Sequence, residues 1–148
     1  MTEATPTPAP VLRKSTPVLV VDAIAPALAF WRKLNLVVAT EVPEGEGPQT
    51  GFAILAGPGI EIMYQTITSV SADLIAAAGD PDAFRRQAQQ GYLFVEVRDL
   101  AEIEHRLAGE RMVLPLRTTF YGAKELGYSD GAGNIIVFAQ FAAAPAAE

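Results

Sequence analysis

The chain has 148 residues, with 17 acidic and 11 basic side chains that give a formal net charge of −6 at pH 7. Its length fits one domain, and its 50% apolar content is typical of a globular protein. The acidic balance disfavours nucleic acid and anionic membranes as partners, and the absence of cysteine excludes disulfides, thiolate metal sites and cysteine nucleophiles.

Both ends of the sequence have the composition of tails. The segments MTEATPTPAP and AAAPAAE predict tails at 1–14, which we expect to be disordered, and at 142–148, with a single domain at 15–141. The N-terminus lacks a basic-then-apolar signal pattern, and no stretch of about 18 or more apolar residues occurs. We therefore expect a cytoplasmic protein that does not interact with membranes.

The first half predicts one strand, one helix and three further strands. A strand is predicted at 16–22. A helix is predicted at 24–34, with an apolar stripe at helical spacing made by Ala27, Leu28, Phe30, Trp31 and Leu34. Three more strands are predicted at 36–43, 50–56 and 59–66. Trp31 fits the stripe and is predicted to pack in the core.

The second half predicts the same order of elements after a connector. The connector at 67–90 suggests one or two short helices, broken at Gly79-Asp80-Pro81. A helix is predicted at 99–108, with Asp99 as its N-cap, Glu102 in the capping-box position and Gly109 as its stop. The strands of this half are predicted at 92–98, 111–118, 123–129 and 134–141.

The two halves align when the chain is shifted against itself by 76 positions. The shift places 16–21 on 92–97, Gly51-Phe52 on Gly127-Tyr128, and Ala56-Gly57 on Ala132-Gly133. The sequence thus predicts an α+β fold of two βαβββ modules, at 15–66 and 91–141. One helix covers one face of each four-stranded sheet, so the opposite faces should line a cleft.

Paired βαβββ units with the motifs VLVVD, LAFWRKL, FVEVRDL and FYGAKELGYSDGAGN resemble the glyoxalase/bleomycin-resistance/dioxygenase superfamily, also called vicinal oxygen chelate proteins. The resemblance covers about residues 15–141. It implies a curved-sheet cleft. It does not imply one activity, because the superfamily holds metal-dependent lyases, isomerases, transferases and dioxygenases as well as metal-free proteins that sequester antibiotics.

In the metalloenzymes of this superfamily, each half supplies a His at the start of its first strand and a Glu or Gln early in its fourth. The matching positions here hold Thr16 and Glu61 in the first half, and Tyr92 and Val137 in the second. A divalent metal needs several converging nitrogen or oxygen ligands, and Glu61 alone could not hold one. We therefore expect no metal and no cofactor.

Strand alternation identifies the side chains that face the cleft. The candidate ligand-binding residues are Glu61, Tyr92, Glu96, Met63, Phe94, Val137, Phe52, Phe120, Tyr121 and Thr16. Gln65 is predicted to face the cleft too, and Tyr128 could join as the repeat partner of Phe52. Aromatic walls with a few carboxylates suit a flat ligand that carries a positive charge. Glu61 could instead pair with Arg117 or Lys124.

Other catalytic patterns are absent from the sequence. The one histidine, His105, is predicted at a solvated helix position, so no Ser–His–Asp set is credible. The GAGN segment lacks the Lys-Ser/Thr of a phosphate loop and enters a strand. We therefore assign no catalytic residue.

The leading hypothesis is a metal-independent, homodimeric protein that sequesters a small molecule in its cleft. One alternative is a lyase, isomerase or oxygenase with a displaced metal site, using Glu61, Glu96, Tyr92 and Glu125. A third is a cleft filled by its own side chains, in a structural or partner-binding dimer.

Overall fold

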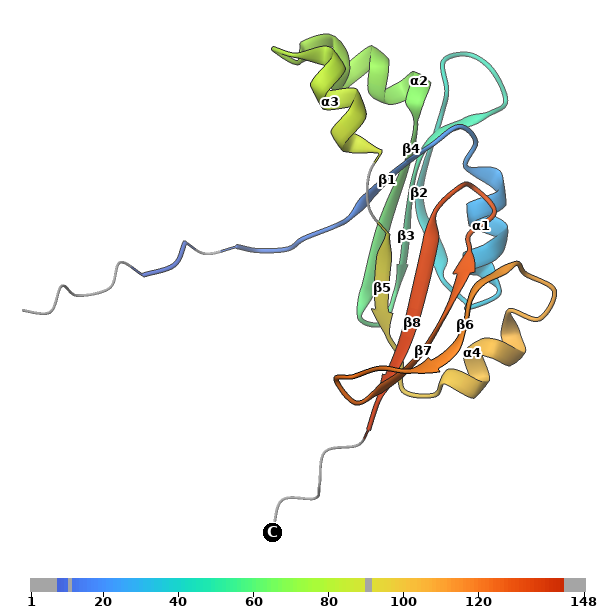
Figure 1. Cartoon of the computed structure of the whole chain (residues 1–148). Helices are drawn as coiled ribbons and strands as arrows, with labels where there is room; N and C mark the ends of the chain where they lie inside the picture. The colour runs from blue at the N-terminus through green and yellow to red at the C-terminus, as the bar shows by residue number, and fades with distance from the viewer. Residues whose placement is uncertain (1–7, 11, 90–91, 143–148) are drawn as a thin grey trace, which may run out of the picture.

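The computed structural model describes residues 8–10, 12–89 and 92–142 (Figure 1). Of the tails predicted at 1–14 and 142–148, residues 1–7, 11 and 143–148 lie outside the described residues. The first module forms one four-stranded sheet in the order β1-β4-β3-β2, in which β1 and β4 are parallel. Its elements are β1 (Val18–Val21), α1 (Ala25–Arg32), β2 (Val37–Pro43), β3 (Thr50–Gly57) and β4 (Ile60–Thr66).

The second module repeats this arrangement in a sheet of order β5-β8-β7-β6, again with a parallel first and fourth strand. Its elements are β5 (Leu93–Glu96), α4 (Leu100–Arg106), β6 (Met112–Thr118), β7 (Ala123–Ser129) and β8 (Ile135–Phe141). The predicted α+β fold of two βαβββ units is therefore confirmed.

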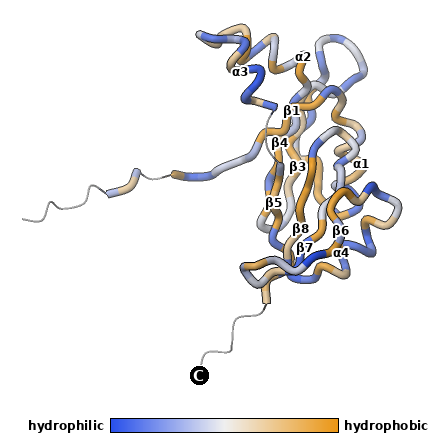
Figure 2. The backbone as a smooth tube through the Cα atoms, viewed as in Figure 1, coloured by the Kyte–Doolittle hydropathy of each residue, from blue (hydrophilic) through white to orange (hydrophobic). Residues whose placement is uncertain are grey.

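The connector between the modules is helical, as predicted. It consists of α2 (Ile67–Val70), a π-helical turn (Ser71–Ile75) and α3 (Pro81–Ala88). The break falls at the predicted Gly79-Asp80-Pro81, where the Asp80 carboxylate accepts the backbone N–H of Ala83 at 3.0 Å. α3 buries none of its residues and is largely hydrophilic, whereas β3, β4 and β8 are largely apolar (Figure 2).

Helix α4 has the predicted ends. The Asp99 carboxylate accepts the Glu102 N–H at 3.3 Å, and Gly109 adopts a φ of 91° just after the helix. The predicted capping box is incomplete, because the Glu102 side chain accepts a hydrogen bond from Arg106 Nε at 3.1 Å instead of from the Asp99 N–H. In the described part of the chain, no helix is long and apolar enough to cross a membrane.

One hydrophobic core joins the two modules on the helix-covered faces of their sheets. Trp31 on α1 meets Phe138 on β8 with ring centroids 6.2 Å apart, which confirms its predicted packing role. Trp31 Nε1 donates to Tyr64 Oη at 2.8 Å, and Tyr64 Oη donates to Asp130 Oδ2 at 2.7 Å. The other core residues include Leu28, Phe30, Leu55, Ile62, Leu107, Leu126, Tyr128 and Ile136.

The faces predicted for the fourth strands are confirmed, but the pairing of Phe52 with Tyr128 is wrong. Ile62 and Ile136 are both fully buried in the core, as alternation predicts. Tyr128 is also 2% exposed in that core, whereas Phe52 precedes the core residue Ala53 and lies on the opposite face of its sheet. The segment from β1 to β3 is longer than the segment from β5 to β7, so the ungapped shift that aligns β1 with β5 misaligns β3 with β7.

Strand registers give the correct correspondence. Val18 pairs with Met63 and Met63 with Ile54 in the first sheet, while Phe94 pairs with Val137 and Val137 with Gly127 in the second. Two residues before Ile54 and Gly127 lie Phe52 and Glu125. The structural counterpart of Phe52 is therefore Glu125, a residue on the open face of the second sheet.

Candidate functional site

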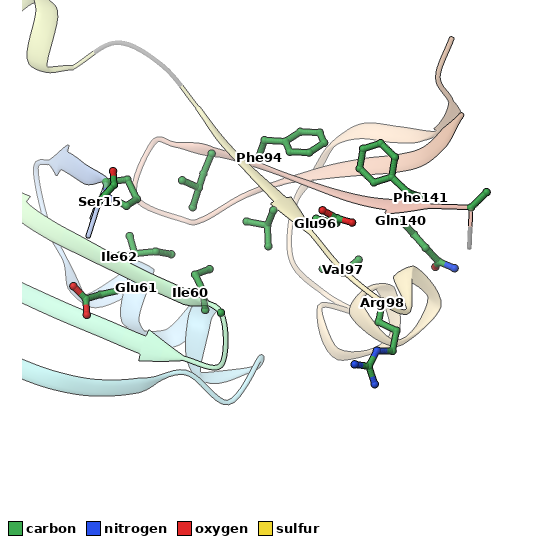
Figure 3. A pocket seen from close by; sticks show the side chains of 15 residues that line it. Ser15, Ile60, Glu61, Ile62, Phe94, Glu96, Val97, Arg98, Gln140 and Phe141 are labelled. Carbon is green, nitrogen blue, oxygen red and sulfur yellow. The ribbon is translucent and has the colours of Figure 1, made fainter. Parts of the chain in front are cut away.

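An open groove of about 990 Å³ lies between the modules. Its walls come from the start of β4, from β5 and the residues after it, and from the end of β8. The predicted ligand-binding residues Glu61, Phe94 and Glu96 all line this groove. Figure 3 shows Glu61 on one side of it and Glu96 on the other, with the Phe94 and Phe141 rings near each other.

Glu61 is already paired within the chain. Lys14 Nζ lies 2.8 Å from Glu61 Oε2, and Thr16 Oγ1 donates to Glu61 Oε1 at 2.7 Å. The hydrogen bond from Lys14, followed by that from Thr16, lowers the pKa of the Glu61 carboxyl below its usual value. The alternative of pairing with Arg117 or Lys124 is wrong, and Lys14 was missed because it lies in a segment with the composition of a tail.

A second pocket, of about 360 Å³, opens on the uncovered face of the second sheet. The predicted residues Tyr92, Phe94, Tyr121 and Val137 line it. Val137 and Leu114 also line it, and both lie close to Gly127. Glycine is required there, because a Cβ at position 127 would lie only 3.0 Å from Leu114 Cβ. Phe94 lines both hollows, so they adjoin along β5.

A chain of four aromatic rings borders the two hollows. Ring centroids lie 6.4 Å apart for Phe94 and Phe141, 5.9 Å for Phe141 and Tyr121, and 5.0 Å for Tyr121 and Phe120. All four side chains are exposed, and Phe120 is 97% exposed. Exposed neighbouring aromatic rings are typical of a binding surface rather than of a core.

Glu125 lies at the second pocket and was not among the predicted ligand-binding residues. Its side chain is 8% exposed, with Arg117 Nε 3.3 Å from Oε1, and Tyr121 Oη donates to Oε2 at 2.8 Å. This hydrogen bond to the carboxylate is the main cause of a raised pKa for the Tyr121 phenol. The sequence named Glu125 only in the enzyme alternative, and the ungapped shift matched Phe52 with Tyr128 rather than with Glu125.

Three other predicted residues lie beside the hollows rather than in their walls. Met63 and Phe52 are half-buried on the open face of the first sheet. Thr16 is partly buried and contacts the groove through Glu61. His105 is exposed on α4, as predicted.

The residues at the metal positions of the resembled superfamily do not fit a divalent metal. Glu61 is the one carboxylate of the set, and it is bonded to the Lys14 ammonium. Extending the β5–β8 register places Ile135, rather than Val137, opposite Tyr92. Both candidates for that corner are apolar, so the ligand set is incomplete with either. Within residues 8–10, 12–89 and 92–142, no three His, Asp or Glu side chains are grouped to hold a metal ion.

Comparisons with known proteins identify the fold. No family model and no curated protein matches the sequence. A glyoxalase-related enzyme from Fulvimarina pelagi has a TM-score of 0.64 at 14% identity, with 88% of each chain covered. A glyoxalase/bleomycin resistance protein/dioxygenase from Nocardioides has a TM-score of 0.59 at 16% identity, covering 94% of this chain and 92% of that one.

The bleomycin-binding protein from bleomycin-producing Streptomyces verticillus, solved with copper(II)-bleomycin, has a TM-score of 0.57 at 16% identity. The similarity covers 91% of this chain and all of that one (100%). The resemblance inferred from the sequence motifs is thus confirmed at the level of the fold. At these identities the similarity establishes the fold and not the activity.

Proposed function

We propose that this chain is a cytoplasmic, metal-independent protein that binds and sequesters a small, flat molecule carrying a positive charge. The observation that carries the proposal is the row of exposed aromatic rings from Phe94 to Phe120 beside two adjoining hollows. Solvent-exposed rings stack on flat molecules and attract cations through their faces. The bleomycin-binding protein of Streptomyces verticillus, which shares the fold, supports a role in binding small molecules.

The charges of the inter-module groove support a positively charged ligand. Glu61 and Glu96 line the groove on its two sides, together with Arg98. Lys14 already places an ammonium group 2.8 Å from Glu61, at a contact where 63% of the Lys14 side chain is exposed. A ligand ammonium could take the place of Lys14 at little cost, because an ion pair this exposed to water contributes little to stability.

Replacing Glu61 or Lys14 is expected to change affinity in opposite directions. In calorimetric titrations with proflavine, a flat aromatic cation, Glu61→Gln should weaken binding by about two- to fivefold, since it removes one exposed ionic contact. Lys14→Ala should strengthen binding by a similar factor, because the Glu61 carboxylate loses its internal partner. Glu46→Gln, at an exposed position in the loop before β3, is the matched control and should leave affinity unchanged.

Two results would contradict the proposal. The first is an absence of binding to the wild-type protein for both proflavine and bleomycin. The second is an equal loss of proflavine affinity in Glu61→Gln and Glu46→Gln, which would indicate attraction by overall charge instead of a site.

We also propose that the chain acts as a homodimer. Large apolar side chains are exposed on the strands of both sheets, among them Val18, Val42, Phe94 and Leu116, each more than 40% exposed. Association of two chains would remove such exposed apolar side chains from water. Light scattering during gel filtration should give a mass of two 15.7-kDa chains, and Leu116→Asp on β6 should shift the mass toward one chain. A wild-type mass of one chain would reject the homodimer.

A further inference from the structure

The second pocket is lined by Arg117, and the neighbouring Glu125 carboxylate fixes the orientation of its guanidinium. Arg117 on β6 faces Glu125 on β7, to which it is also the register partner, and its Nε lies 3.3 Å from Glu125 Oε1. The other carboxylate oxygen, Oε2, accepts the Tyr121 hydroxyl at 2.8 Å. Glu125 is 6% exposed, so its two oxygens are directed to partners within the chain and little of it is open to a ligand.

Arg117 is exposed where Glu125 is buried. Half of its side chain (50%) is accessible, and the contact with Glu125 uses Nε. A guanidinium carries five N–H donors, so the two terminal nitrogens keep four donors that water or a ligand must satisfy. Guanidinium donors match the paired oxygens of a carboxylate, and these charge-assisted bonds are stronger than neutral ones.

We infer that the second pocket binds the acceptor group of a planar ligand, preferably a carboxylate, through Arg117 held in place by Glu125. The ligand body would lie against Phe94 and Tyr121, above the apolar floor of Val137 and Leu114. Glu125 acts here as a positioning residue, since it is buried beneath Arg117. The compensating carboxylate makes the pair neutral, so recognition depends on directed N–H donors more than on net charge.

This inference rests on the proposed function and specifies its ligand more closely. Phe94 is a wall of both hollows, with Glu61 in the groove on one side and Arg117 in the pocket on the other. One flat molecule could then bind Glu61 through a positive group and Arg117 through an acceptor group.

The test uses three ligands that share one flat ring system and differ in their polar group: naphthoate, naphthamide and naphthylmethylamine. In calorimetric titrations of the full chain at pH 7, naphthoate should bind with higher affinity than naphthamide. Arg117→Ala should weaken naphthoate binding about tenfold, as expected for loss of a charge-assisted hydrogen bond worth about 1.4 kcal/mol or more. The same substitution should leave naphthylmethylamine within about twofold.

Lys124→Ala is the matched control. Lys124 is exposed on β7 immediately before Glu125, so its side chain points to the other face of the same strand. Lys124→Ala removes one positive charge from the same hairpin and should leave the affinity for naphthoate unchanged. The far-ultraviolet circular dichroism of both variants should match the wild type, because neither side chain is buried.

The outcomes separate this inference from the proposed function. Equal weakening of naphthoate binding by Arg117→Ala and Lys124→Ala would overturn the role of Arg117. A naphthoate affinity that neither substitution changes would overturn it too. Binding of proflavine or naphthylmethylamine without any binding of naphthoate would overturn the acceptor site and leave the proposed function standing. Failure of all these ligands, with bleomycin included, would overturn both.

Discussion

Replacing Asp130 with alanine is expected to lower the free energy of unfolding by about 3–5 kcal/mol, because several hydrogen-bond donors lose their acceptor together. Asp130 is fully buried, and its carboxylate accepts four hydrogen bonds: from Tyr64 Oη, from the backbone N–H groups of Ala132 and Asn134, and from Asn134 Nδ2. Alanine would leave these donors without this acceptor, and the Tyr64 hydroxyl among them lies in the buried core. Each unsatisfied buried donor costs about 1–3 kcal/mol.

The measurement is urea denaturation followed by the fluorescence of Trp31, the one tryptophan of the chain. Asp82→Ala is the matched control, because the Asp82 side chain is 82% exposed and its loss should change stability by about 0.5 kcal/mol or less. A double-mutant cycle with Tyr64→Phe should be non-additive, since the two residues share one hydrogen bond. A loss below about 1 kcal/mol for Asp130→Ala would contradict the network's structural role.

The order of helices and strands, and the faces they bury, could be predicted because they depend on short-range sequence patterns. The stripe through Trp31 set the buried face of α1, and the alternation in β4 placed Ile62 in the core and Glu61 outside it. Caps such as Asp80 and Asp99 act within three residues, so the sequence fixes the positions where α3 and α4 begin.

Correspondence between the modules could not be predicted in the same way. The β3–β4 turn is Pro58-Gly59, whereas the β7–β8 turn runs from Asp130 to Asn134. The longer turn exists because Asp130 accepts backbone N–H groups two and four residues ahead.

Tyr128 was displaced earlier in the chain. Val18 to Ile54 spans 36 positions and Phe94 to Gly127 only 33, so the shift of 76 that aligns β1 with β5 is three too large for β3 and β7. The longer β7–β8 turn then changes the offset again, by one position.

The candidate site shows a related limit of strand alternation. Alternation gives the face on which a side chain lies, and it placed Phe94 and Glu96 outward, as the structure has them. Alternation does not predict which charged side chains form ion pairs on that face. The partners of Glu61 and Glu125 are Lys14 and Arg117, one from a segment with tail composition and one from a neighbouring strand.

Trp31→Ala is expected to lower the free energy of unfolding by about 3–5 kcal/mol, the range for removing a large buried aromatic side chain. Trp31 is 1% exposed and contacts rings of both modules, with centroids 5.2 Å from Phe30 and 6.2 Å from Phe138. The resulting cavity would lie where α1 meets the second sheet. The measurement is thermal or urea denaturation followed by circular dichroism.

Two further substitutions separate the cavity from the lost hydrogen bond. Trp31→Phe keeps most of the ring and removes the donor to Tyr64, so it should cost about 1–2 kcal/mol. Phe120→Ala removes an aromatic ring that is 97% exposed, and should change stability by about 0.5 kcal/mol or less. If Trp31→Ala cost no more than Trp31→Phe, packing at this junction would contribute little. The two modules would then be joined mainly by the hydrogen bonds through Tyr64 and Asp130, and not by a shared core.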